Sequence, residues 1–342
     1  VMLLPTVLAE DAPHMLRASG VLPVLFLLPA LGIEALRAWL APRARWLAPV
    51  AIALVLAFGA TEGAWRYAAH LRGPAAYYQF EAGASTLAAE ANAFLGVGWS
   101  GEGLRAPGGN PTSGRAVYVA PRLWRDWASV RYLTAPAASQ GLVYSDAAWP
   151  GFASAEDVAL YLWPFEEDPA ALDLLPRDRL VVVREGAQER GDLEAESRLL
   201  YVSLHTKPPD AAPQGIEARW AEGITLLGHR VTPLEGGQLA VDLYWRADEP
   251  LGRGYTVFVH LLEDDILVSQ HDGPAAGGYY GTERWRAGDV VFDRHLLPFP
   301  GAYDPERHQV RVGMYWWETM EHLSPLDGAG NPTGATGHTL SE

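Results

Sequence analysis

The sequence predicts a membrane α-helical hairpin, then a small α/β domain, then a C-terminal all-β sandwich of immunoglobulin-like or jelly-roll-like type. Two apolar stretches, about 21–40 and 46–64, predict the hairpin, because about twenty apolar residues cross a hydrocarbon core of roughly 30 Å. Short apolar runs between helical segments predict the α/β domain. Closely spaced alternating strands without helical patterns predict the sandwich.

Charges around the two apolar stretches predict their orientation. A short loop joins the stretches and carries Arg43 and Arg45, and Arg37 lies just before it. Positive charges mark the cytoplasmic side, so both outer ends are expected on the opposite side. We therefore expect a multi-pass protein of the cell membrane with a large C-terminal extracytoplasmic region. The alternative is a pair of buried helices in a soluble protein, although apolarity all round a helix is typical of a membrane.

The first residues favour an incomplete chain. Val1 is not an initiator methionine, and an apolar stretch runs directly into an acidic loop. We expect a larger membrane protein upstream, although a processed or trimmed chain would look the same.

Composition excludes several classes of function. The 342 residues carry a net charge of −15 and few clustered cations, which argues against nucleic-acid binding. The absence of cysteine excludes disulfides, thiolate metal sites and cysteine nucleophiles. No residue is assigned to a metal or a cofactor from the sequence. The 35 glycines, 26 prolines and 13 tryptophans favour a turn-rich β protein over a helical bundle.

The pattern of apolar and turn-forming residues divides the chain after residue 66 into two expected domains, a linker and a tail. Residues 67–206 are expected to form the extracytoplasmic α/β domain, with a helix at 80–95. A proline-rich linker at 207–214 precedes the sandwich, 215–328, and a loose tail, 329–342. The expected strands of the α/β domain are 116–120, 142–144, 158–163, 180–183 and 199–204. Those of the sandwich lie at 216–231, 238–247, 255–262, 289–297 and 308–317.

No motif for self-sufficient catalysis occurs, so no catalytic residue is assigned. The acidic run 166–168 follows Trp163-Pro164-Phe165, and carboxylates beside aromatic rings suit either a sugar site or a surface turn. A second acidic run, 263–265, suits a calcium site or, since it lacks the usual loop spacing, a hairpin turn. His260 and His271 lie near it, and lone strand histidines are more often structural.

Aromatic side chains near the C-terminus are candidates for glycan contact, because ring faces stack on sugars. The alternative is that the same rings fill the sandwich core. The candidates are Trp285, Tyr279, Tyr280 and Trp316.

His14 and Arg17 lie three residues apart just before the first apolar stretch. On a helix they would share one face, and an arginine at the membrane surface suits a lipid-linked phosphate. The alternative is an anchor whose charge reaches out of the bilayer.

The segment that contains His14 and Arg17 resembles part of a known protein family. The string at 10–36 (EDAPHMLRASGVLPVLFLLPALGIEAL) resembles the late part of bacterial polyprenol-phosphate-sugar glycosyltransferases. These are similar to the dolichyl-phosphate-mannose protein mannosyltransferases and have the GT-C fold. The stretch at 66–82 is similar to the external exit after a late span, and about 223–326 is similar to a β-sandwich often appended to these enzymes.

The resemblance implies an integral-membrane transferase that moves a sugar from a polyprenyl-phosphate donor to a glycan, lipid or protein acceptor. His14 and Arg17 would bind the donor phosphate. The family's catalytic carboxylate lies in the first external loop, and no residue here matches it. We therefore expect it upstream, so that this chain alone would be inactive. The alternative is a membrane-anchored glycan-binding or structural β-sandwich protein without catalysis.

Overall fold

A computed structural model describes residues 22–42, 46–99, 101, 113–134, 143–191 and 194–340. The chain forms two compact units, Val1–Ala76 and Tyr77–Glu342. Each unit is treated separately below.

Two long helices, α3 (Leu22–Leu40) and α4 (Leu47–Arg72), lie in the described part of the first unit, where the two apolar stretches occur. In the described part of the chain, α4 is the one helix that is both long and apolar enough to cross a membrane. Its side chains are almost all exposed, and Ala48 is its buried residue. The two-span hairpin and the multi-pass placement stay predictions, and Arg43 and Arg45 lie outside the described residues.

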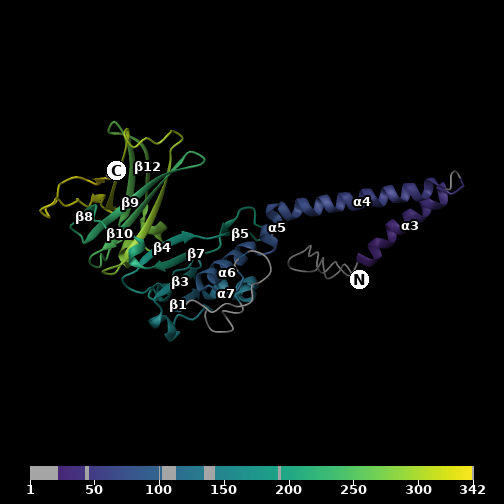
Figure 1. Ribbon diagram of the computed structural model, residues 1–342, viewed down its shortest axis with the longest axis horizontal. Coiled ribbons are helices and arrows are strands. Elements are labelled where there is room, and N and C mark those ends of the chain that lie inside the picture. Colours follow the sequence, from purple (N-terminus) through teal and green to yellow (C-terminus); the bar gives the residue numbers. More distant parts are fainter. Residues whose placement is uncertain are drawn as a thin grey trace. The chain divides into compact units, whose positions relative to one another are not determined.

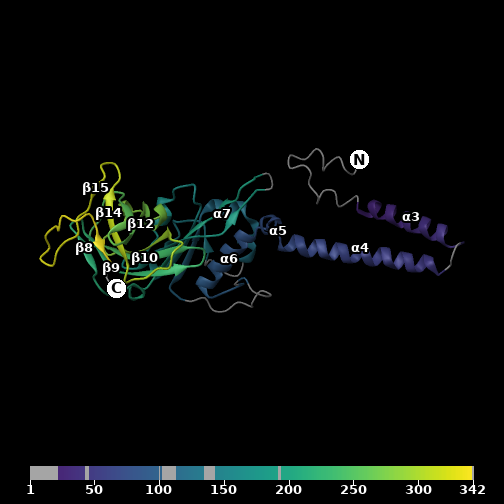
Figure 2. The same cartoon turned by 90° about the horizontal axis from the view of Figure 1, so that it is seen from above.

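The second unit combines short helices with a large β-rich region (Figure 1). After α5 (Pro74–Gln79), its helices are α6 (Ala82–Leu95), α7 (Pro121–Asp126), α8 (Ala128–Leu133), η2 (Pro150–Ser154), α10 (Pro169–Leu172), η3 (Pro209–Ala211), η4 (Ala275–Gly278) and η5 (Thr282–Arg284). The helix predicted at 80–95 is α6, whose buried residues recur at the three- and four-residue spacing of one helix face. It packs on β1 and β3, which are labelled beside it in Figure 1. Figure 2 shows α6 and α7 of this unit from above.

Most of the strands belong to two sheets. The nine-stranded sheet has the order β2-β1-β3-β7-β4-β13-β10-β9-β8, and the other has the order β12-β11-β14-β15, with β16 paired to β14. The strands are β1 (Arg115–Val119), β2 (Val143–Tyr144), β3 (Asp157–Leu162), β4 (Leu180–Glu185), β7 (Val202–Lys207), β8 (Ala218–Trp220), β9 (Ile224–Leu234), β10 (Gln238–Ala247), β11 (Thr256–Glu263), β12 (Ile266–Pro274), β13 (Val290–Pro298), β14 (His308–Trp316), β15 (Glu321–His322) and β16 (His338–Thr339). A separate ribbon pairs β5 (Gln188–Glu189) with β6 (Arg198–Leu199).

The predicted alternation in β10 is present in the structure. Leu239, Val241, Leu243 and Trp245 are all fully buried, as period-two strands with one core-facing side require. They share one hydrophobic core with alternate residues of β11 and β14, so both sheets contribute to it. The structure thus has a β-rich C-terminal region of several sheets, and the immunoglobulin-like or jelly-roll-like strand order stays a prediction.

One sheet continues across the predicted linker at 207–214. Within the linker lies η3, and on either side of it β4 and β13 pair in parallel, with Val181 opposite Val291. The regions expected to form an α/β domain and a sandwich therefore share a backbone ladder. Their division into separate domains stays a prediction.

A histidine of β7, His205, is partly buried among aromatic rings of the second unit. The ring of His205 is 5.6 Å from that of Tyr161 and 5.5 Å from that of Phe94. Burial, assisted by the nearby charges of Arg184 and Lys207, lowers the pKa of His205 to about 4. The neutral imidazole is therefore the form that the folded protein favours.

This burial predicts acid sensitivity. A folded-state pKa below the unfolded value of 6.5 means that the stability contributed by neutral His205 is complete above pH 6.5 and is lost as pH falls towards 4. We expect His205→Phe to remove about 3 kcal/mol of the stability difference between pH 7 and pH 4. Urea unfolding of both proteins at several pH values measures it, and equal pH slopes would contradict the assignment.

Candidate functional site

Tyr279 occupies a position that an unusual backbone segment creates. It follows η4, in which Ala276, Gly277 and Gly278 all have positive φ, at 52°, 65° and 84°. Two of these three residues are glycines. Glycine has no Cβ and therefore adopts a positive φ without a steric penalty. The backbone N–H of Ala276 donates to Oδ1 of Asp293 at 2.9 Å, which fixes η4 against β13.

Two cavities lie beside Tyr279, and both are lined by Gly277 and Tyr279. The first, here called the acidic cavity, has a volume of about 450 Å³ and is bounded by the loop after β3 and the segment from η4 to η5. The second, here called the basic cavity, has a volume of about 470 Å³ and is bounded by β4, β12, β13 and η4. Tyr279 is half-buried, and its burial raises the pKa of its hydroxyl.

The acidic cavity contains the aromatic–carboxylate segment singled out in the sequence. Phe165 is exposed, whereas Trp163 is buried. Nη2 of Arg284 lies 3.3 Å from Oε2 of Glu167, so the two halves of the cavity wall are joined by an exposed ion pair. This cavity therefore brings ring faces, carboxylates and a cation together.

Asp168 has a structural role within the same segment. Its Oδ1 accepts from the backbone N–H of Ala171 at 3.0 Å and caps α10, and its Oδ2 accepts from the Tyr118 hydroxyl at 2.6 Å. Both carboxylate oxygens are thus engaged. Of the acidic run, Glu166 and Glu167 are the residues that can turn towards a ligand.

The basic cavity is lined by charged residues that end or alternate along strands. Arg184 and Glu185 end β4, His271 belongs to β12, and Arg294 lies on β13. Arg294 donates to both oxygens of Asp242, at 2.6 and 2.8 Å. Apolar side chains complete the lining: Val183, Ala276, Phe292 and Leu296.

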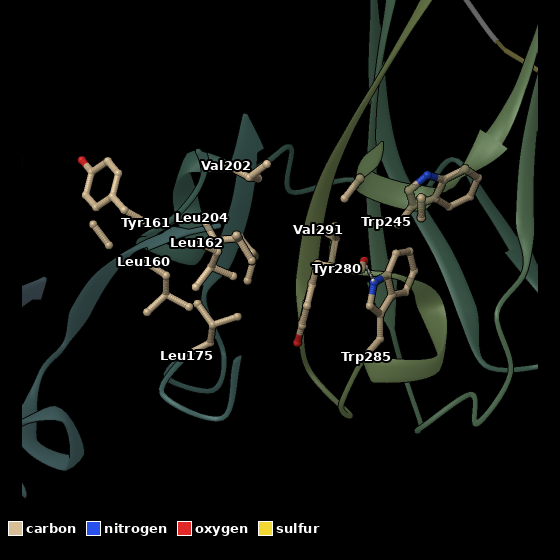
Figure 3. Packing of buried hydrophobic residues seen from close by; sticks show 14 of the residues in the cluster. Leu160, Tyr161, Leu162, Leu175, Val202, Leu204, Trp245, Tyr280, Trp285 and Val291 are labelled. Atoms are coloured by element: carbon tan, nitrogen blue, oxygen red, sulfur yellow. Dashed lines mark hydrogen bonds between the residues drawn. The ribbon is translucent and has the colours of Figure 1, made fainter. Parts of the chain in front are cut away.

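The four predicted glycan-contact residues do not form one exposed platform. Trp285 and Tyr280 are fully buried, and Figure 3 shows both beside Trp245 and Val291 in the core. Nε1 of Trp285 donates to the carbonyl of Tyr280 at 3.0 Å, and the Tyr280 hydroxyl donates to Asp289 at 2.6 Å. The core interpretation fits these two residues, since neither ring has a face open to a sugar.

The other two differ from each other. Trp316 is partly buried, and the guanidinium of Arg253 lies 4.6 Å from the centre of its ring. Tyr279 lines both cavities. A role in glycan contact therefore stays a prediction for Tyr279 and Trp316, and the structure places them in different surroundings.

The remaining predicted sites are placed as follows. His14 and Arg17 lie outside the described residues. The acidic run 263–265 forms the turn between β11 and β12, where Asp264 and Asp265 have positive φ and Glu263 pairs with Arg307. Among the residues that the structure describes, no group of three histidine, aspartate or glutamate side chains could hold a metal ion.

Sequence reasoning missed the basic cavity. Phe292, Arg294 and Leu296 alternate along β13 and all line it, so a period-two pattern with an arginine between apolar residues was the available signal. The partner residues come from β4, more than a hundred residues earlier, and nothing local indicates that the two strands are neighbours.

No protein-family model matches the chain, and no curated protein matches it. A solved structure, the endonuclease/exonuclease/phosphatase from Beutenbergia cavernae DSM 12333, is similar over 46% of this chain at 14% identity, with a TM-score of 0.18. The similarity spans 34% of that protein. A TM-score this low supports no conclusion about fold or function.

Burial of Trp285 predicts a stability defect. Trp285→Ala leaves a cavity in the core and removes a hydrogen bond, so we expect a loss of about 3–5 kcal/mol in the free energy of unfolding. The matched control is Trp317→Ala, whose ring is 63% exposed and whose loss should stay within about 0.5 kcal/mol. Denaturant unfolding of the full chain in detergent, followed by circular dichroism, measures both, and equal stabilities would contradict the placement of Trp285.

Proposed function

We propose that this chain is the C-terminal, membrane-anchored part of a glycosyltransferase that moves a hexosyl or pentosyl group from a polyprenyl-phosphate donor to an extracytoplasmic acceptor. The acceptor is a glycan, a lipid or a protein. The catalytic loop belongs to an upstream part, and His14 and Arg17 contact the donor phosphate. The proposal includes the two-span hairpin and the extracytoplasmic β-sandwich.

The observation that supports the membrane anchoring in this proposal is the spacing of two tryptophans, Trp46 at the N-cap of α4 and Trp65 within the helix. Trp46 and Trp65 are both 68% exposed. They are nineteen positions apart, which at a rise of 1.5 Å per residue is about 28 Å. Exposed indole rings favour the two interfaces of a bilayer whose hydrocarbon core is roughly 30 Å thick. The charges at this end are paired, with Nε of Arg66 2.6 Å from Glu62.

The enzyme class is supported by the resemblance of residues 10–36 and 223–326. A carboxylate general base would deprotonate the acceptor, and basic groups would stabilise the phosphate leaving group. Neither step is assigned to a described residue of this chain.

A second candidate, glycan binding without catalysis, is favoured by the two cavities at Tyr279. Sugar sites combine an aromatic ring face with carboxylates and arginines that bind hydroxyl groups, and small-molecule sites are concave with few polar groups. The acidic cavity has this composition, with Phe165, Glu167 and Arg284 in its lining. Acceptor binding in the first proposal uses the same surface.

Transfer activity tests the first proposal. Membranes that carry the whole reading frame, including any upstream coding region, should transfer a radiolabelled sugar from a polyprenyl phosphate to an endogenous acceptor. Membranes carrying residues 1–342 alone should not. A reading frame without further spans upstream, or whole-frame membranes without polyprenyl-phosphate-dependent transfer, would leave glycan binding as the function.

Tyr279 provides the test of glycan binding. Tyr279→Ala should weaken oligosaccharide binding by about tenfold, because a stacked aromatic ring contributes about 1–1.5 kcal/mol. The matched control is Tyr132→Ala, which removes a ring that is 75% exposed and lines neither cavity. Calorimetric titration of the full chain in detergent measures both variants, and an equal effect of the two would contradict the role of Tyr279.

A further inference from the structure

Three side chains form a hydrogen-bonded line from the core to the basic cavity. Oδ2 of Asp293 lies 2.9 Å from Nε2 of His295, and Nδ1 of His295 lies 2.8 Å from Nδ1 of His271. Asp293 and His295 are each 1% exposed, whereas His271 lines the cavity. A line of this kind fixes the orientation of its last ring, which here is the imidazole of His271.

The carboxylate at the inner end is held by further donors. Nε1 of Trp245 donates to Oδ2 of Asp293 at 3.2 Å, and the backbone N–H of Ala276 donates to Oδ1 at 2.9 Å. Both carboxylate oxygens thus accept hydrogen bonds from the protein. Because a carboxylate only accepts, we assign Nε2 of His295 as the donor in its contact with Asp293.

The hydrogen bond between Nδ1 of His271 and Nδ1 of His295 contains a single proton, so one nitrogen donates and the other accepts. With the ring proton of His295 assigned to Nε2, its Nδ1 has a lone pair, which accepts the Nδ1–H of His271. Nε2 of His271 then has a lone pair and, among the described residues, no partner. Burial and the neighbouring His295 lower the pKa of His271, which favours its neutral form. The cavity thus contains an oriented imidazole acceptor.

The remaining polar groups of the cavity differ in how they are already engaged. Arg294 is bound to both oxygens of Asp242, so its charge is balanced. Arg184 has no carboxylate of a described residue within 4.0 Å, and its charge acts at longer range on the Glu90 carboxyl. Glu185, its neighbour on β4, also lines the cavity, and the whole chain carries a net charge of −15. One unpaired guanidinium in these surroundings suits a singly charged anion better than a phosphate dianion.

We propose that the basic cavity binds a carboxylated sugar of the hexuronate type. The sugar carboxylate pairs with Arg184, the pyranose ring packs on Tyr279, and a hydroxyl group donates to Nε2 of His271. Asp293 and His295 are positioning residues that set the tautomer of His271. The proposal rests on glycan binding at Tyr279 and adds the chemical class of the glycan.

The first experiment compares ligands. Methyl glucuronoside, methyl glucoside and inorganic phosphate are titrated into the full chain in detergent. We expect the glucuronoside to bind at least about tenfold more tightly than the glucoside, since charge-assisted hydrogen bonds contribute more than about 1.4 kcal/mol. Arg184→Gln should abolish this preference. The matched control, Arg219→Gln on β8, lies outside the cavity and should keep it.

The second experiment tests the positioning role. In the intact protein, the nitrogen-15 shifts of His271 should show a protonated Nδ1 and an unprotonated Nε2. In His295→Phe, which removes the acceptor, the proton should move to Nε2, and affinity for the glucuronoside should fall about tenfold. His271→Leu, which has no acceptor atom, should show the same loss of affinity without altering a buried site, so the assignment of the acceptor is testable even if the His295 variant does not fold.

Outcomes separate this inference from the proposed function. Equal affinity for the two glycosides, with both lost in Tyr279→Ala, overturns the uronate inference and keeps glycan binding. Phosphate that binds as tightly as the glucuronoside identifies a general anion site and also overturns it. Absence of binding by either glycoside overturns both. An unchanged His271 tautomer in a folded His295→Phe protein overturns the positioning role.

Discussion

The parallel pairing of β4 with β13 is the constraint on which the rest of the second unit depends. Three residues of each strand are in register, from Leu180 opposite Val290 to Phe292 opposite Val182. A small cluster of buried residues supports this junction: Leu180, Val182, Ala212, Leu227 and Val290. Because the ladder joins the first five strands of the sheet to the last four, it also places Arg184 and Glu185 beside the residues of β13. The basic cavity exists through this pairing.

Local patterns located several of the helices and strands but did not indicate which strands are neighbours, and they missed β12 (Ile266–Pro274) altogether. Periodicity located α6 and the buried face of β10, because one buried side leaves a direct trace in the sequence. Parallel pairing over more than a hundred residues leaves no such trace, since the paired segments, 180–182 and 290–292, are short apolar runs that could pair elsewhere. The continuous sheet across 207–214 was therefore beyond the reach of sequence reasoning.

Local sequence patterns were likewise insufficient to show which side chains line the cavities of the candidate site. Tyr279 and Tyr280 are adjacent and chemically alike, yet one lines two cavities and the other is in the core. They lie between η4 and η5, where no regular period indicates which side chain points inward. The aromatic–carboxylate segment at 163–168 was recognisable from its composition. Its partner Arg284 was not, because it comes from a distant part of the chain.

Asp293 has a consequence for how the two cavities respond to each other. One carboxylate holds the backbone of η4, which carries Tyr279 into both cavities, and also the imidazole line that ends at His271. Groups that share a single buried acceptor are not energetically independent, and their effects on binding should not add. The two cavities should therefore behave as one thermodynamically linked site, with a coupling free energy that a double-mutant cycle between Tyr279 and His271 can measure.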